Sequence, residues 1–152
     1  MKRLREIMRE GFLFAVRKDA TVTEAVRTMA ENNVGIVAVL EGDRLIGVFS
    51  ERDAVRRVID KGIDPATTLI EQVMTRDVLV ADEQENYQTA MRTMDQANIR
   101  HLPVVREGQV VSMLSIRDLV RVDMARMGEE LRFLHEYLYT VPPDIVQEPK
   151  GS

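Results

Sequence analysis

The sequence contains no cysteine and only two histidines among its 152 residues. Without cysteine there are no disulfides, no thiolate metal ligands and no cysteine nucleophile. No apolar run approaches the roughly 20 residues of a membrane span, and the charged first residues are not followed by the apolar core of a signal peptide. We therefore expect a protein of the cytoplasm with no membrane partner.

An excess of positive charge is also missing. Lysine and arginine number 21 against 25 acidic residues, a formal net charge of -4. No global field therefore favours nucleic acid, and an anionic ligand must be met by local positive groups. The 45% of hydrophobic residues suits one compact unit or two very small ones.

Groups for catalysis are equally scarce. His101 and His135 are the only imidazoles, and neither has sequence neighbours that would complete a metal site. Ser50 and Ser115, the serines of the repeated motif described below, lack a nearby base. We expect no enzyme activity, no metal and no catalytic cofactor.

An internal repeat organises the chain. At an offset of 65 residues the second half matches the first without a gap, and an offset of 66 extends the match upstream, so the first copy has one extra residue. The matched residues are Ala25 with Ala90, Arg27-Thr28-Met29 with Arg92-Thr93-Met94, Asn33 with Asn98, Ser50 with Ser115, Arg52 with Arg117 and Asp53 with Asp118.

Each copy predicts the element order β-α-β-β-α. The expected strands are 12–16, 36–40 and 45–49 in the first copy and 78–81, 102–105 and 110–114 in the second. Capping boxes at Thr21 to Glu24 and at Thr68 to Glu71 are expected to open two helices, and residues 60–65 form a linker. Because a unit of about 60 residues buries only ~60% of its unfolded surface, the copies should share a core.

Two motifs, Gly47-Val48-Phe49-Ser50-Glu51-Arg52-Asp53 and Ser112-Met113-Leu114-Ser115-Ile116-Arg117-Asp118, resemble the signature of cystathionine β-synthase-type (CBS) domains, as does Arg100 to Val105. The resemblance implies an α+β fold with two CBS domains, 7–62 and 70–124, packed about a pseudo-twofold axis. It also implies two clefts for an adenosine ligand, with AMP as first choice and ADP, ATP, NAD or S-adenosylmethionine as alternatives, in a regulatory role towards an unknown protein.

The Ser-x-x-Asp pattern has two readings. A serine followed three residues later by an acid satisfies the free amides at a helix start. In the other reading, the same amides suit a phosphate, the carboxylate accepts from a ribose diol, and the preceding arginine holds a phosphate. The recurrence of all three residue types in both copies favours the ligand site.

The candidate ligand residues follow from the motifs and the resemblance. For the second cleft they are Thr75, Val80, Arg100, His101, Leu102, Pro103, Ser115, Arg117 and Asp118; for the first they are Gly35, Ile36, Val37, Ser50, Arg52 and Asp53. The second is the better nucleotide candidate, because Arg100, His101 and Thr75 stand where the first copy has Gly35, Ile36 and Arg9. Two departures from the family pattern, Ser112 for glycine and Ala38 for proline, remove no polar contact.

After Ile116 the helical pattern continues past the repeat as an arm, residues 125–140, before a proline-rich tail, 141–152. Met127, Leu131, Leu134 and Leu138 are spaced as a heptad seam, and Phe133, Tyr137 and Tyr139 add aromatic surface. This arm either folds back on its own domain or forms a homodimer contact; the aromatic residues favour a contact surface, and we expect a homodimer. A structural dimerisation module with vestigial clefts is therefore the alternative function.

Overall fold

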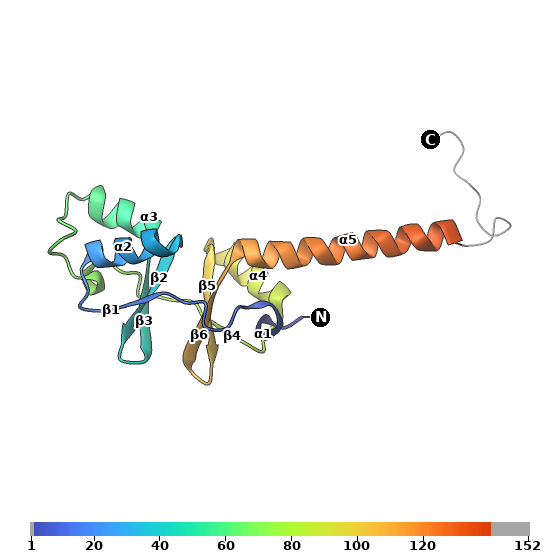
Figure 1. Cartoon of the computed structure of the whole chain (residues 1–152), viewed down its shortest axis with the longest axis horizontal. Coiled ribbons are helices and arrows are strands. Elements are labelled where there is room, and N and C mark those ends of the chain that lie inside the picture. The colour runs from blue at the N-terminus through green and yellow to red at the C-terminus, as the bar shows by residue number, and fades with distance from the viewer. Residues whose placement is uncertain (1, 141–152) are drawn as a thin grey trace.

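The computed structural model describes residues 2–140 and contains two similar units followed by a long helix (Figure 1). The first unit comprises β1 (Ala15–Arg17), α2 (Val22–Asn32), β2 (Ile36–Glu41), β3 (Arg44–Ser50), α3 (Glu51–Asp53) and the π-helical η1 (Ala54–Ile59). The second comprises β4 (Ala81–Asp82), α4 (Tyr87–Ala97), β5 (His101–Arg106), β6 (Gln109–Ser115) and α5 (Ile116–Thr140). Two short helices, α1 (Leu4–Ile7) and the 3-10 turn η2 (Ile70–Gln72), precede the units. The predicted α+β fold with an extended C-terminal helix is confirmed.

The two sheets have the same topology. Their orders are β1-β2-β3 and β4-β5-β6, with the first pair parallel and the second antiparallel in each. A register shift also recurs, between Val39 and Leu40 and between Val104 and Val105. The units are therefore duplicates in backbone detail as well as in sequence.

Local signals explain where the main helices begin and end. The backbone amide of Glu24 donates to the Thr21 hydroxyl and that of Thr21 to the Glu24 carboxylate, so the predicted capping box is present. Helices α2 and α4 end at Asn33 and Asn98, whose φ values are 52° and 53°. Asparagine tolerates this left-handed conformation better than most residues, which accounts for the match of these two positions in the repeat.

Two predictions of local structure were wrong in detail. The first strand of each unit is shorter than expected, beginning at Ala15 and at Ala81. In the first unit the reason is that Phe12 hydrogen-bonds to the other unit instead. Thr68 does not cap a helix: its hydroxyl donates to the backbone oxygen of Asp64 at 2.7 Å, and the turn after it begins at Ile70.

The segment that leads into each unit packs on the other unit. Before β1, the Gly11 amide donates to Val111 O and the Met113 amide donates to Phe12 O, both at 3.0 Å. Before β4, Val48 and Thr75 exchange two backbone hydrogen bonds of 3.0 and 2.8 Å. These crossing segments, residues 9–12 and 73–75, tie the two units into one body.

The hydrophobic core of each unit also includes residues from outside that unit. Leu4, which lies before the expected start of the first domain at residue 7, is fully buried in the second unit's core beside Tyr87. Ile70, Val73 and Met74 belong in turn to the first unit's core. The prediction of one shared core was therefore wrong: each unit has a core of its own, and each core is completed by chain from outside its repeat.

Helix α5 leaves the body as a single straight rod (Figure 1). Tyr87 anchors its base: the tyrosine hydroxyl donates to Asp123 at 3.0 Å and accepts from Arg126 at 3.1 Å. Further along, the seam residues Met127, Leu131, Leu134 and Leu138 are 44–67% exposed, so the arm does not fold back on its own domain. The predicted tail and the Tyr139 side chain lie outside what the structure describes. No helix within residues 2–140 has the length and hydropathy that a membrane crossing requires.

Candidate functional site

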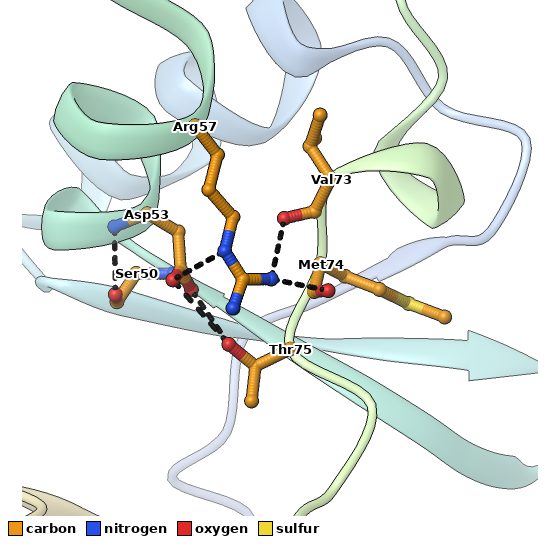
Figure 2. Close-up of polar contacts among 6 residues, drawn as sticks. All are labelled: Ser50, Asp53, Arg57, Val73, Met74 and Thr75. Atoms are coloured by element: carbon orange, nitrogen blue, oxygen red, sulfur yellow. Dashed lines mark hydrogen bonds and ion pairs between the residues drawn. The ribbon is translucent and has the colours of Figure 1, made fainter. Parts of the chain in front are cut away.

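In the first unit the Ser-x-x-Asp motif closes on itself at the junction of β3 and α3. The Ser50 amide donates to the Asp53 carboxylate at 3.0 Å, and the Asp53 amide donates to the Ser50 hydroxyl at 3.2 Å. Asp53 also accepts from the Thr75 hydroxyl, 3.3 Å from both carboxylate oxygens (Figure 2). Both hydrogen bonds of a helix cap are therefore present. The Asp53 carboxylate has a further partner, Thr75, from the crossing segment.

Arg57 completes this first cluster. Its Nε lies 3.7 Å from Asp53 Oδ1, and its Nη1 donates to the backbone oxygens of Val73 at 3.1 Å and Met74 at 2.7 Å (Figure 2). The carboxylate of Asp53 thus shares its environment with one guanidinium and one hydroxyl, and it helps to hold the crossing segment 73–75.

The second unit repeats the motif without this cluster. The Ser115 amide donates to Asp118 at 3.0 Å, and the Asp118 amide donates to the Ser115 hydroxyl at 3.2 Å. At the position equivalent to Arg57 the second copy has Val122, which packs against the core. Within residues 2–140 the carboxylate of Asp118 has no other hydrogen bond and no ion pair. Its remaining lone pairs are therefore available to a ligand.

Two clefts lie at these motifs and share a rim where the units meet. The first has a volume of about 280 Å³ and includes Ser50, Arg52, Asp53 and Thr75. The second has about 470 Å³ and includes Ser115, Arg117 and Asp118. The rim that both share consists of Gly35, Ile36, Glu51, Arg100 and His101. The larger volume falls within the range usual for small-molecule sites, and the smaller lies just below it.

His101 stands on the shared rim and begins β5. Its burial lowers the pKa of the imidazole below the ordinary value, an effect that the carboxylates of Asp118 and Glu51 oppose and Arg100 reinforces. At pH 7 the imidazole is therefore mainly neutral, and it offers a ligand a hydrogen bond rather than a charge.

Gly47, the glycine of the family pattern, and Ser112, which replaces it in the second copy, both contact a crossing segment. A side-chain carbon added to Gly47 would lie 2.5 Å from Met74 Sδ and 2.8 Å from Thr75 O. Ser112, at the equivalent place, is buried and donates to the backbone oxygen of Arg9 at 2.9 Å. Both positions therefore face the crossing segments.

The structure corrects the assignment of one residue to its cleft. Thr75, expected in the second cleft, lines the first and bonds to Asp53. Arg9, its counterpart, lines the second cleft. The exchange follows from the crossing of the lead-in segments, each of which runs along the opposite unit before it enters its own.

Four other candidates do not line either cleft. Val37 and Leu102 are fully buried in the two cores, and Pro103 is buried opposite Met113 in the sheet. Val80 is 45% exposed. In each strand the side chain that follows the rim residue points away from the cleft, because successive side chains alternate between faces.

Further lining residues were not predicted from the sequence. In the first cleft they are Val48, Glu51, Asn98 and Ile99; in the second they are Arg9, Phe12, Phe14, Asn33, Val34, Glu51, Met113, Ile116 and Arg121. Arg121 had a readable signal, since it lies one helical turn after Arg117 and shares its face. No such signal marked Phe12 and Phe14, because they reach the second cleft only through the path of the chain before β1.

Comparison with known proteins agrees with this architecture. The family model of the CBS domain matches residues 4–60 and 70–125. A mitochondrial CBS domain-containing protein of Arabidopsis thaliana is 33% identical over 125 residues, an alignment that covers 79% of this chain and 61% of the relative. The chain therefore spans about three fifths of that relative's length.

Two solved structures are similar in fold. A protein with CBS domains from Burkholderia ambifaria is 31% identical, with a TM-score of 0.72, 76% of this chain covered and 85% of that one. A CBS domain protein from Pyrobaculum aerophilum, solved in complex with AMP, is 26% identical, with a TM-score of 0.71, 77% of this chain covered and 89% of that one. With its duplicated β-α-β-β-α units and matched Ser-x-x-Asp motifs, the chain belongs to the CBS-domain family and carries two such domains in tandem.

Proposed function

We propose that this chain is a regulatory module that binds an adenine nucleotide, AMP or a related adenosine phosphate, and conveys its occupancy to a partner protein. The observation that carries the proposal is the carboxylate of Asp118, which has one internal hydrogen bond and lies in a cleft with arginine and phenylalanine side chains. A carboxylate of this kind accepts hydrogen bonds from a ribose diol, and guanidinium groups bind phosphate. The complex of the Pyrobaculum aerophilum relative with AMP supports the same ligand class.

A regulatory role suits the placement of the clefts. Both lie where the two units meet, so a ligand there contacts residues of both. A ligand that binds one arrangement of the units better than another shifts their equilibrium towards it. Since the motif serines accept hydrogen bonds from their own helix starts, we assign them to capping and ligand binding rather than to catalysis.

Adenosine ligands are expected to stabilise the folded chain. A site that exists only in the folded state adds about 1.4 kcal/mol at a tenfold excess of ligand over Kd. Differential scanning fluorimetry with AMP, ADP, ATP, NAD, NADH and S-adenosylmethionine tests this and identifies the preferred ligand; guanosine monophosphate serves as the control. A melting temperature that stays constant across the whole panel would refute ligand binding and favour a structural dimerisation module.

We also propose that the chain forms a homodimer through α5. The heptad seam continues without interruption through Val120, Met124, Met127, Leu131, Leu134 and Leu138, all of them exposed in the single chain. Six apolar side chains on one stripe of a helix that leaves the body are typical of a coiled-coil interface.

Light scattering at micromolar concentration should therefore report about twice the chain mass of 17.4 kDa. Replacing Leu131 and Leu134 by lysine should shift the mass towards one chain, because two buried charges would oppose the pairing. A matched double replacement of Glu129 and Glu136 by lysine, off the seam, should leave the mass unchanged. A single-chain mass for the native protein would contradict the dimer.

A further inference from the structure

We propose that the two clefts are specialised, and that the second takes the phosphate chain of an adenosine di- or triphosphate through Arg9, Arg100, Arg117 and Arg121. The first cleft does not bind the phosphate chain, because Arg57 and Thr75 already hold the carboxylate of Asp53 there. This inference rests on the proposed adenine-nucleotide function and names the ligand class and the cleft.

Charge distinguishes the clefts most clearly. Four arginines line the second cleft against two carboxylates, those of Glu51 and Asp118. Two arginines, Arg52 and Arg100, line the first against the carboxylates of Glu51 and Asp53. The second cleft is therefore net positive in a chain whose overall charge is -4, whereas the first is neutral. A local excess of this kind selects the more negative ligand.

The four arginines are also uncommitted. Within residues 2–140, none of them forms an ion pair or donates a side-chain hydrogen bond to another residue, although Arg106, Arg57 and Arg126 all do. The Arg9 guanidinium lies over the Phe12 ring, 3.8 Å from its centroid, a contact that orients it without neutralising its charge. Guanidinium groups without carboxylate partners are suited to bidentate binding of phosphate oxygens.

The four side chains come from three separate segments that converge on one cleft. Arg117 and Arg121 lie one turn apart at the start of α5, Arg100 precedes β5, and Arg9 belongs to the crossing segment. A single phosphate is smaller than this spread of donors, whereas a chain of two or three phosphates offers several oxygens at once. The volume of about 470 Å³, against about 280 Å³ in the first cleft, leaves room for the longer ligand.

The second cleft also has aromatic rings against which a purine can pack. Phe12 and Phe14 line it, in an edge-to-face pair with ring centroids 5.7 Å apart and planes at 82°. Among the described residues that line the first cleft there is no phenylalanine, tyrosine or tryptophan, and the His101 imidazole on the shared rim is the only ring. The two phenylalanine rings, the Asp118 carboxylate and the four arginines thus meet in the second cleft.

Isothermal titration of the full-length protein with ATP, AMP and adenosine in magnesium-free buffer tests the proposal. We expect one ATP site per chain, and ATP to bind at least fivefold more tightly than AMP and AMP more tightly than adenosine. Raising the salt concentration should weaken ATP binding more than adenosine binding, because the exposed arginines are screened.

Two variants at equivalent positions of the repeat separate the clefts. Arg117→Gln should weaken ATP binding about tenfold and adenosine binding less than threefold, whereas Arg52→Gln should change both less than twofold. Both arginines are exposed, so neither change should disturb folding, and Arg121→Gln provides a second test on the same face. The melting temperature of each unliganded variant checks this.

The inference is overturned if ATP and adenosine bind equally, or if Arg52→Gln costs as much ATP affinity as Arg117→Gln. In both cases the proposed nucleotide-binding function survives, because a ligand still binds. If none of the three compounds binds, the proposed function fails together with this inference.

Discussion

Replacing Asp118 by asparagine is expected to weaken AMP binding by about 10- to 150-fold while lowering the free energy of unfolding by no more than ~1 kcal/mol. The carboxylate lies in the second cleft, where it can accept charge-assisted hydrogen bonds from both hydroxyls of a ribose. Weakening two such bonds costs roughly 1.5–3 kcal/mol in binding. Folding suffers less, because a carboxylate in the first turn of a helix contributes only ~0.3–1 kcal/mol through the helix dipole.

Asp53→Asn is the matched control, since Asp53 holds the same place in the first repeat. Its carboxylate is held by Thr75 and Arg57, so its loss should lower stability more than affinity. Calorimetric titration with AMP, beside urea melts of the unliganded proteins, measures both quantities for both variants. Unchanged affinity together with reduced stability in Asp118→Asn would show that this carboxylate only caps its helix.

Replacing Gly47 by valine should lower the free energy of unfolding by about 1–3 kcal/mol, the usual cost of overpacking. The added Cβ would meet Met74 Sδ at 2.5 Å and Thr75 O at 2.8 Å. The methionine side chain can turn away, but the backbone oxygen cannot easily move, because Thr75 and Val48 exchange two hydrogen bonds. The crossing segment must therefore shift, and the contacts of Arg57 with Val73 and Met74 shift with it.

Ser112→Gly makes the comparison at the equivalent position of the second unit. It removes one hydrogen bond, to the backbone oxygen of Arg9, and should cost only ~0.5–1.5 kcal/mol. Urea denaturation followed by circular dichroism measures both variants. If Gly47→Val proved as stable as the native chain, the close approach of segment 73–75 to β3 would not be a constraint on the fold.

Local sequence signals were enough to predict the order of the elements and the two Ser-x-x-Asp motifs, and they account for several helix ends. The 65-residue repeat predicted the duplicated β-α-β-β-α order, because each copy carries its own periodicity and turn residues. The capping box at Thr21 and the asparagines at positions 33 and 98 fixed the ends of helices through contacts within a few residues. The Ser-x-x-Asp motifs were found for the same reason, since each closes on itself across three residues.

Tertiary structure alone decided which residues share a cleft. Thr75 lies in the cleft opposite to the one expected, and Arg9 lines the second cleft without having been predicted there. Arg57 reaches across to Val73 and Met74, because the lead-in segments cross between the units. That crossing depends on backbone hydrogen bonds between segments about 30 to 100 residues apart in sequence, such as those of Val48 with Thr75 and of Phe12 with Met113. Every residue except proline has a backbone N–H and C=O that can form such bonds, whatever its side chain. The side chains therefore do not indicate which segments pair, and only the folded chain shows it.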